Sequence, residues 1–436
     1  LAHSIDGMAL WTAVDLAAAD GTPHPVQQAL LQNHASQCGF CTPGFAMSLF
    51  ALYQNQVLAG QSVTREQAQV ALAGNLCRCT GYRPLLEAAQ SLAALPRVEQ
   101  DDADLLLKLK LLGQSGRALD PDFAPDNLSR SETTAAGPAN AASGYWAPTR
   151  LAELLACRAA WPQAQIVAGA TDVGLWLTKQ QRQLAQIIDV TRCAELLQVQ
   201  RTPGWLCIGA AVSLSDAFAA MLQDWPELRG FLQRFAGPPV RNSGTLGGNV
   251  VNGSPIGDSM PLLIALGARL LLASQRGQRR LALENFYLGY RQTALAADEV
   301  LLHIEIPTPE YCAQPGLAAV PALPEHLAGT LSSQPASAAE PPSLVLRAWK
   351  ISKRFEDDIS AVCLALRLEI QNKRIVSASI GVGGVAATPM RAIKTEAALA
   401  GRACTQATFE AAIEVLRSEF TPISDLRASA AYRRSV

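Results

Sequence analysis

The sequence predicts a multi-domain α+β protein with three folded parts: an N-terminal domain of four helices, a central α/β domain, and a small C-terminal α/β domain with an antiparallel sheet. Three observations support this prediction. The 436 residues exceed what one ordinary core holds. Apolar residues follow a helical spacing up to about residue 96, and beyond it short strands alternate with helices. Two stretches rich in Pro, Ala, Ser or Asp, residues 99–143 and 308–342, interrupt the pattern.

Composition limits the possible classes of function. Hydrophobic residues make up 49% of the chain and charged residues 17%, which is typical of globular domains. The formal net charge of −1 gives no general attraction to nucleic acid or to anionic membrane, and no basic stripe is interleaved with aromatic residues. The longest apolar run, residues 261–273, contains Arg269 and is too short to cross a bilayer. We therefore expect a cytoplasmic protein that binds neither nucleic acid nor membrane.

Two short cysteine pairs dominate the N-terminal domain. Cys38 and Cys41 form the first pair, and Cys77 and Cys79 form the second. Helices are expected after each pair, because a proline follows where a first helical turn tolerates it. A helix N-terminus favours thiolate over thiol, so the four cysteines predict a metal site. Zinc and an iron–sulfur cluster both remain open, and the C-x-C spacing of the second pair favours iron–sulfur.

Four helices are expected around these cysteines. One begins at Pro25, one follows each cysteine pair, and one is opened by the capping-box residues Thr64 and Gln67. His24 and His34 are possible ligands by residue type. Four cysteines already complete a site, however, so we expect capping or surface roles for both histidines.

The other six cysteines are scattered singly. They do not resemble a secreted disulfide framework, and we expect each to be a small buried apolar residue. These residues are Cys157, Cys193, Cys207, Cys312, Cys363 and Cys404.

Two glycine-rich stretches mark the central domain. A strand at residues 165–168 runs into the turn 169–172 and then into a helix at 173–178, which presents backbone N–H groups to a phosphate. The second stretch, residues 243–258, is expected to be a packed loop that a ligand approaches closely. Together they indicate a large nucleotide cofactor. Neither G-x-G-x-x-G nor a P-loop motif is present, so a Rossmann site or a P-loop is not indicated.

The remaining elements are expected at intervals along the chain. A short helix is predicted at 105–111, and Ser213 with Asp216 is predicted to cap another helix. Further strands of the central domain are predicted at 187–190, 206–209 and 300–306, with an apolar helix at 261–266. The C-terminal domain is predicted to have strands at 345–349, 363–370 and 375–381, a hairpin turn near Asn372, and helices at 393–399 and 409–420.

Several of these motifs resemble a known family. Residues 37–44 and 74–84, which carry the cysteine pairs, are similar to the helical 2Fe-2S domain of the molybdenum hydroxylases. The rest of the chain resembles their FAD-binding domain, of the molybdopterin-dehydrogenase type, and its C-terminal partner domain, at residues 169–172, 245–249, 289–291, 350–359 and 425–433. Iron–sulfur and flavin domains without a molybdenum domain resemble the small subunit of bacterial xanthine dehydrogenases.

The resemblance implies two cofactor sites. Cys38, Cys41, Cys77 and Cys79 would hold one 2Fe-2S cluster. FAD would be bound by the first glycine-rich turn, by the second stretch, and by four further residues. These residues are Ile166, Val167, Ala168, Gly169, Ala170, Thr171, Asp172 and Val173; Thr245, Gly247, Gly248 and Asn249; and Phe235, Asp258, Leu301 and Lys350.

The resemblance also implies an oxidoreductase function in purine metabolism. Hypoxanthine or xanthine would be oxidised on a large partner subunit that carries molybdopterin, and electrons would pass through 2Fe-2S to FAD and then to NAD⁺. Two copies of each subunit would form a heterotetramer. No side chain of this chain is expected to act as acid, base or nucleophile. The alternatives are the same subunit of an aldehyde, nicotinate or carbon monoxide dehydrogenase, or a truncated fragment that binds cofactors without relaying electrons.

The chain departs from this family at its beginning. The family's plant-type ferredoxin domain, with its own cluster, is expected ahead of the helical domain, whereas residues 1–9 resemble only its last strand. We therefore expect a truncated reading frame whose relay is interrupted at that cluster. The expected domain boundaries are a remnant at 1–9, a helical 2Fe-2S domain at 10–98, a linker at 99–143, an FAD domain at 144–307, a disordered insertion at 308–342 and a C-terminal domain at 343–436.

Overall fold

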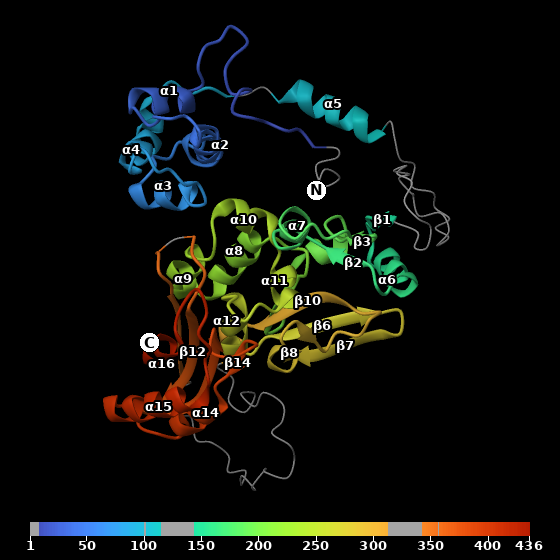
Figure 1. Ribbon diagram of the computed structural model, residues 1–436, viewed down its shortest axis with the longest axis vertical. Coiled ribbons are helices and arrows are strands. Elements are labelled where there is room, and N and C mark those ends of the chain that lie inside the picture. Colours follow the sequence, from blue (N-terminus) through green and yellow to red (C-terminus); the bar gives the residue numbers. More distant parts are fainter. Residues whose placement is uncertain (1–7, 100–101, 115–143, 313–341, 356) are drawn as a thin grey trace. The chain divides into compact units, whose positions relative to one another are not determined.

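The computed structural model describes residues 8–99, 102–114, 144–312, 342–355 and 357–436 (Figure 1). The chain divides into two compact units, one of residues 1–124 with 236–240 and the other of residues 125–235 with 241–436. Most of the ferredoxin remnant expected at 1–9, most of the linker expected at 99–143 and nearly all of the insertion expected at 308–342 lie outside the described residues.

Unit 1 contains the four expected helices. Their bounds are α1 (Pro25–Gln32), α2 (Thr42–Leu52), α3 (Arg65–Leu72) and α4 (Arg83–Ser91), and a π-helical turn (Tyr53–Val57) extends α2. The helical spacing of apolar residues gives each helix one buried face, so that Phe45, Leu49 and Leu85 are almost fully buried in one core. The short helix expected at 105–111 is present and longer, as α5 (Ala103–Gln114).

Side chains at the helix starts follow the sequence signals. The Thr64 hydroxyl accepts from Gln67 N at 3.2 Å, and Gln67 Oε1 accepts from Thr64 N at 2.8 Å, which confirms the capping box. His24 caps α1, because its Nδ1 accepts from Val26 N at 3.2 Å. His34 is exposed, so the expected capping and surface roles of the two histidines are confirmed.

Unit 2 begins with two sheets. The first is parallel, in the order β1 (Gly144–Trp146), β3 (Gln186–Asp189), β2 (Gln165–Val167), with α6 (Leu151–Ala160) and α7 (Val173–Thr178) in its connections. The second is antiparallel, in the order β4 (Val199–Thr202), β5 (Trp205–Gly209), β10 (Val300–Pro307), β6 (Arg269–Ser274), β7 (Gly277–Ala282). A ribbon of β8 (Tyr287–Gly289) and β9 (Gln292–Thr293) follows β7 along the chain.

The C-terminal part of unit 2 is a four-stranded antiparallel sheet covered by helices. Its strands are β11 (Ser343–Ile351), β12 (Val362–Gln371), β13 (Arg374–Gly383) and β14 (Met390–Arg391). Asn372 and Lys373 have φ values of 51° and 60°, which confirms the predicted hairpin turn. Helices α14 (Ile393–Leu399) and α15 (Gln406–Glu419) share a core with this sheet, and α16 (Ala430–Ser435) ends the chain.

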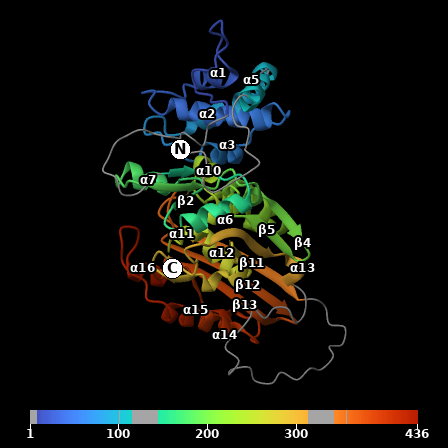
Figure 2. The ribbon, with the colours of Figure 1, turned by 90° about the vertical axis from the view of Figure 1, so that its right-hand side faces the viewer.

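One buried helix joins the central part of unit 2 to this C-terminal sheet. Every residue of α12 (Ser259–Leu266) is buried, and the helix lies between β10 and the strands β12 and β13 (Figures 1 and 2). A Cβ on Gly381 would lie 1.9 Å from Pro261 O, so β13 packs directly on the helix backbone. The other helices are α8 (Leu214–Asp224), α9 (Arg229–Gln233), α10 (Pro238–Ser243), α11 (Leu246–Asn252) and α13 (Pro309–Cys312).

The scattered cysteines follow the expectation with one exception. Five of the six are buried, but Cys404 is exposed, so the prediction for that residue is wrong. Cys404 lies at the surface because its segment runs along the hairpin turn, where its N–H donates to Lys373 O at 2.8 Å. Within the part of the chain that the structure describes, no helix is long and apolar enough to cross a membrane.

Candidate functional site

The four paired cysteines of unit 1 meet in front of α2 and α4. Cys41 is the N-cap residue of α2, and Cys79 lies shortly before α4. Cys38 Sγ is 3.6 Å from Cys79 Sγ, and the thiol of Cys41 interacts with that of Cys77. All four are free thiols. The chain therefore brings the two sequence pairs together as two spatial pairs, each with one cysteine from either loop.

Hydrogen-bond donors favour the ionised form of two of these thiols. Thr80 donates to Cys77 Sγ from its hydroxyl at 3.1 Å and from its N–H at 3.4 Å. The hydroxyl has the larger effect in lowering the pKa of Cys77 to about 7 from an ordinary value of 9.0. A hydrogen bond from the backbone of Phe40 lowers the pKa of Cys38. Burial raises the pKa of Cys41, and the contact with Cys38 raises that of Cys79.

This arrangement fits a binuclear cluster. Among the described residues, no group of three or more His, Cys, Asp or Glu is placed to hold one metal ion. The two thiol pairs suit two iron atoms with two cysteine ligands each, and the donors that face Cys77 and Cys38 suit thiolates. The assignment of the four cysteines as cluster ligands stays a prediction.

Three residues that the sequence did not single out individually hold the second cysteine loop. Asn75 Nδ2 donates to Ser48 Oγ on α2 at 2.8 Å. The Tyr82 hydroxyl accepts from Cys77 N at 3.1 Å, and Tyr82 itself has a φ of 68°. Thr80, described above, is the third. Their positions in the segment from Gly74 to Pro84 were visible in the sequence, but their bonding depends on how the loop returns to α2.

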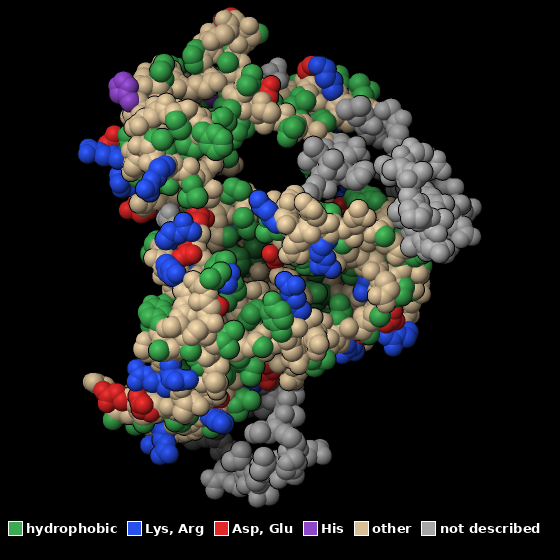
Figure 3. All heavy atoms as spheres, in the orientation of Figure 1, with side chains coloured by type: hydrophobic (Ala, Val, Ile, Leu, Met, Phe, Trp, Pro, Cys, Tyr) green, Lys and Arg blue, Asp and Glu red, His purple; other side chains and the backbone are tan. Residues whose placement is uncertain are grey.

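Large apolar side chains lie exposed beside these thiols. Phe40, between Cys38 and Cys41, is 94% exposed, and Leu76, directly before Cys77, is 65% exposed. Hydrophobic side chains reach the surface of unit 1 over its helices (Figure 3). Exposed apolar residues that gather at one place commonly mark a surface that another protein covers.

In unit 2 the first glycine-rich turn connects β2 to α7, as expected. Ala170 has a φ of 55°. A Cβ on Gly169 would lie 1.7 Å from Ser243 O, so the turn packs directly on the start of the second glycine-rich stretch. Asn252 Nδ2 donates to Asp172 Oδ2 at 2.7 Å and joins the two stretches again. The structure thus brings together two segments that the sequence separates by about seventy residues.

The second stretch differs from the expected loop. Residues from Leu246 to Asn252 form the helix α11, because the Thr245 hydroxyl caps it by accepting from Gly248 N at 2.9 Å. Gly247 N donates to Ala210 O at 3.1 Å, and a Cβ on Gly247 would lie 2.4 Å from that oxygen. The glycines therefore allow close packing within the protein as well as any approach of a ligand.

The last residue of this stretch forms a buried ion pair with the C-terminal sheet. Asp258 Oδ2 is 2.6 Å from Lys350 Nζ, and the two side chains are 5% and 4% exposed. Ser360 Oγ donates to Asp258 Oδ1 at 2.5 Å. Cys363 Sγ lies 3.8 Å from the Asp258 carbonyl oxygen, and burial raises the pKa of this thiol far above its ordinary value. The sequence predicted Asp258 and Lys350 but missed Ser360.

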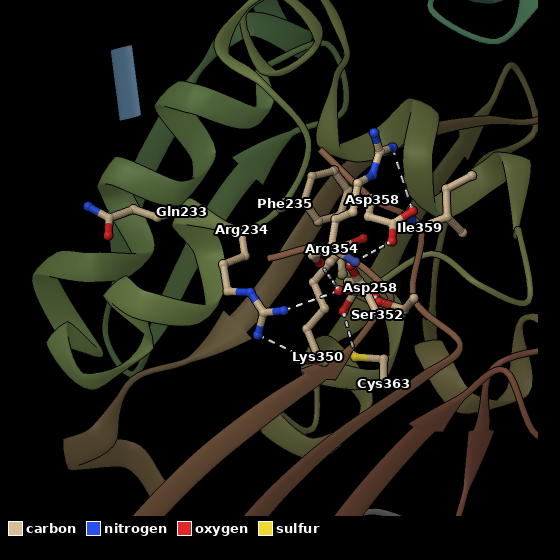
Figure 4. A network of polar contacts seen from close by, with 12 residues as sticks. Gln233, Arg234, Phe235, Asp258, Lys350, Ser352, Arg354, Asp358, Ile359 and Cys363 are labelled. Atoms are coloured by element: carbon tan, nitrogen blue, oxygen red, sulfur yellow. Dashed lines mark hydrogen bonds and ion pairs between the residues drawn. The ribbon is translucent and has the colours of Figure 1, made fainter. Parts of the chain in front are cut away.

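Arg234 is a further residue that the sequence did not reveal. It follows α9 and donates to Lys350 O at 3.0 Å, to Ser352 Oγ at 3.2 Å and to Phe355 O at 3.0 Å. Figure 4 shows Arg234 and its neighbour Phe235 beside the pair of Lys350 and Asp258. Three segments therefore meet at one place: the residues before α10, the residues before α12 and the end of β11.

Two further predicted flavin residues, Phe235 and Leu301, are packed within unit 2. Phe235 packs edge-to-face on Phe218, with ring centroids 5.3 Å apart, and its carbonyl accepts from Arg241 Nη1 at 3.0 Å. Leu301 is buried on β10 at an irregularity in the pairing with β6. Its neighbour Leu302 accepts from Ala210 N at 3.0 Å, and Ala210 in turn holds Gly247.

The site retains donors for a large anionic cofactor. An ammonium group has three N–H donors, and among the described residues Asp258 is the partner that Lys350 Nζ finds. Two donors therefore remain for acceptor oxygens such as those of FAD. The assignment of these residues to FAD stays a prediction.

Comparison with known protein families identifies three domains in this order. Residues 12–90 match a [2Fe-2S] binding domain. Residues 140–309 match the FAD binding domain in molybdopterin dehydrogenase, and residues 347–436 match the CO dehydrogenase flavoprotein C-terminal domain. Both cofactor-binding domains that the sequence resembled are thus present.

Known relatives agree with these matches. Xanthine dehydrogenase of Drosophila subobscura is 30% identical over 99% of this chain and 33% of its own length. Xanthine dehydrogenase/oxidase of Gallus gallus is 29% identical over 91% of this chain and 31% of its own length. The chain therefore spans about a third of the length of these relatives.

Solved structures agree with the fold. Carbon monoxide dehydrogenase from Hydrogenophaga pseudoflava matches with a TM-score of 0.56 and 25% identity, over 67% of this chain and 91% of that one. Quinoline 2-oxidoreductase from Pseudomonas putida 86 matches with a TM-score of 0.55 and 27% identity, over 67% of this chain and 91% of that one. The multi-domain α+β prediction is confirmed, and the chain belongs to the molybdenum hydroxylase family, among the proteins that carry its iron–sulfur and flavin domains.

Proposed function

We propose that this chain is the electron-transfer and flavin subunit of a xanthine dehydrogenase. The observation that carries the proposal is the presence, in one chain, of four paired thiols and a separate flavin-type site, with similarity to xanthine dehydrogenases along nearly its whole length. Electrons would reach the FAD through the 2Fe-2S cluster and leave to NAD⁺. Ten free cysteines without a disulfide suit a reducing compartment, so we place the complex in the cytoplasm.

The chain's own residues would bind and orient the cofactors. Cys38, Cys41, Cys77 and Cys79 would hold the cluster, and Thr80 would donate to the sulfur of Cys77. The two glycine-rich stretches, with Phe235, Leu301 and Lys350, would hold FAD. The bound cofactors supply the one-electron and hydride chemistry, so the protein needs no acid, base or nucleophile of its own.

A second subunit would supply the molybdenum chemistry. In the carbon monoxide dehydrogenase structure the matching chain is covered to 91%, so that chain holds little beyond the matched part, and this supports substrate oxidation on a further polypeptide. We propose a heterotetramer with two copies of each subunit. The exposed Phe40 and Leu76 beside the cluster cysteines support a partner surface at the point where electrons enter.

The metal and flavin content of the purified chain tests the cofactor part of this proposal. A visible spectrum with iron, zinc and flavin quantitation should show two irons per FAD. Four irons per FAD would reveal a second cluster, and zinc without colour would overturn the iron–sulfur assignment.

Substrate turnover tests the purine part. The complete complex, which contains this chain, the molybdenum subunit and the family's ferredoxin-type cluster, should form NADH from hypoxanthine and NAD⁺. Turnover of aldehydes alone would contradict the assignment of purines as substrates. Reduction of a dye but not of NAD⁺ would contradict the assignment of NAD⁺ as the electron acceptor.

A carbon monoxide dehydrogenase subunit is the second candidate. Two observations favour it: residues 347–436 match a CO dehydrogenase flavoprotein domain, and the Hydrogenophaga pseudoflava structure covers 67% of the chain. Oxidation of carbon monoxide by the same complex, with no activity on hypoxanthine, would establish it in place of the xanthine dehydrogenase.

A further inference from the structure

We propose that Ser360, acting through Asp258, is a positioning residue that fixes the Lys350 ammonium for binding FAD. This inference rests on the proposed function, in that the site of unit 2 binds FAD. It gives Asp258 a role other than direct contact, and it adds a residue that neither the sequence motifs nor the comparisons single out.

The first step is the direction of the Asp258 side chain. Asp258 is the N-cap residue of α12, where an aspartate ordinarily accepts from an N–H of the first helical turn. Here it makes no such bond. Both carboxylate oxygens instead face the C-terminal sheet. Oδ2 lies 2.6 Å from Lys350 Nζ, a pair that Figure 4 shows. Oδ1 accepts from Ser360 Oγ at 2.5 Å. Each carboxylate oxygen therefore has a partner in the C-terminal sheet, and one of the two partners is the lysine.

The second step concerns burial. Ser360 is 1% exposed, and the charged side chains are almost as buried. A buried ion pair is useful only when further hydrogen bonds satisfy the groups that the pair leaves over. The Ser360 hydroxyl supplies that bond to Oδ1. Without it, the carboxylate would be free to rotate about its side-chain torsions, and Lys350 Nζ would rotate with it.

The third step is the attachment of Ser360 itself. Lys350 lies opposite Cys363 in the β11–β12 pair, and Ser360 lies two residues before the start of β12. Ala361 N donates to Ile351 O at 2.7 Å, which closes the loop between the two strands. Ser360 and Lys350 are thus held on one rigid edge. Gly384 N donates to Pro255 O at 2.7 Å and fixes the segment before Asp258 to the same sheet.

The consequence is that the C-terminal sheet forms part of the flavin site. The sheet supplies the ammonium group of Lys350 and the hydroxyl of Ser360. The central part of unit 2 supplies the Asp258 carboxylate, which lies between these two groups and orients the ammonium group. Two N–H donors of Lys350 remain for acceptor oxygens of FAD. Their direction depends on the Ser360–Asp258 bond.

The test compares Ser360→Ala, Ser360→Thr and Ser379→Ala in the full chain. Ser379 is the matched control, because it is also buried in the C-terminal sheet and its hydroxyl donates to α12, at Ile264 O over 3.4 Å. Flavin-free protein is titrated with FAD and binding is followed by quenching of flavin fluorescence. The flavin midpoint potential of each loaded protein is then measured.

Ser360→Ala should weaken FAD binding about tenfold, because it removes a hydrogen bond to a charged group. It should also lower the flavin potential, since a less firmly held cation stabilises the reduced, anionic flavin less well. Ser360→Thr, which keeps the hydroxyl, should restore both quantities, and Ser379→Ala should leave both unchanged.

Three results would overturn the inference. The first is wild-type affinity and potential in Ser360→Ala, the second is an equal loss in Ser379→Ala, and the third is no rescue by threonine. In each of these cases the wild type still binds FAD and the proposed function stands, whereas a wild type without FAD binding overturns both. If Ser360→Ala does not fold, Ser360→Cys keeps the volume, weakens the hydrogen bond and is expected to show the same losses.

Discussion

The guanidinium carbon of Arg234 lies 4.5 Å from the centre of the Phe355 ring, and Arg234 Nε donates to the carbonyl oxygen of the same residue at 3.0 Å. The arginine therefore holds the loop after β11 by its ring and its backbone together. Because Arg234 also donates to Lys350 O, the loop and the end of β11 depend on one side chain.

Replacing this arginine should loosen the loop. Arg234→Met keeps the volume but removes the cation and every donor, and should cost about 2 kcal/mol of unfolding free energy. Hydrogen exchange of peptides from residues 350–359 should accelerate. Arg182→Met is the control, because Arg182 also lies over a ring, that of Trp176 at 4.9 Å, but at another place. Equal effects of both variants on residues 350–359 would contradict the assignment.

Loss of a paired cysteine should remove iron but not flavin. Cys38→Ser or Cys79→Ser should abolish the iron content and its visible absorption while the FAD content stays at the wild-type level, since the cysteines and the flavin residues lie in separate units. Cys404→Ser, at the exposed and isolated cysteine, is the control and should keep both cofactors. Concurrent loss of iron and flavin would show that the two units do not fold independently.

The hydroxyl of Thr80 should tune the cluster. Thr80→Val removes the donor to Cys77 Sγ but keeps the side-chain shape, and hydrogen bonds to cluster sulfurs favour the reduced state. We expect unchanged iron content and a lower midpoint potential, measured by redox titration of the cluster's electron paramagnetic resonance signal. Thr80→Ser keeps the hydroxyl and should retain the wild-type potential, and a shift in Thr80→Ser as large as that in Thr80→Val would exclude the hydroxyl as the cause.

His24 should make unit 1 less stable in mild acid. Burial lowers the pKa of His24 below its ordinary 6.5, and its Nε2 has no hydrogen-bond partner among the described residues. The unfolded chain therefore binds a proton more readily than the folded one, so stability is full above about pH 6.5 and falls as the pH drops below it. Urea unfolding at pH 7.5 and 5.5 should show this loss. It should shrink in His24→Asn, which can still cap α1, and persist in His34→Asn, where the histidine is exposed.

Local signals accounted for much of the fold. Proline and capping residues located α2, α3 and α4, and alternation of apolar residues located the long C-terminal strands. The strand β6 was not predicted, because it continues the apolar run of α12. In a short apolar stretch, periodicity does not distinguish a strand from a helix. The helix α11 was expected to be a loop, because its glycines have a low helix propensity.

The site could be predicted from the sequence only where the residue type or its spacing indicates a ligand-binding role. Four cysteines, two glycine-rich stretches and a lysine were visible in the sequence. Ser360 and Arg234 were not, since a serine and an arginine are ordinary surface residues until the fold places them against Asp258 and Phe355. Such residues act through contacts over about a hundred positions of chain, which no local pattern records.

The absence of a side chain at Gly381 has a consequence for how this protein can be divided. Since β13 lies directly on the backbone of α12 there, the sheet covers a helix whose side chains are mostly apolar. A polypeptide that stopped near residue 312 would expose that helix to water and should precipitate or recruit chaperones rather than bind flavin. The FAD binding domain and the C-terminal domain, which match two separate families, are thus expected to fold as one unit.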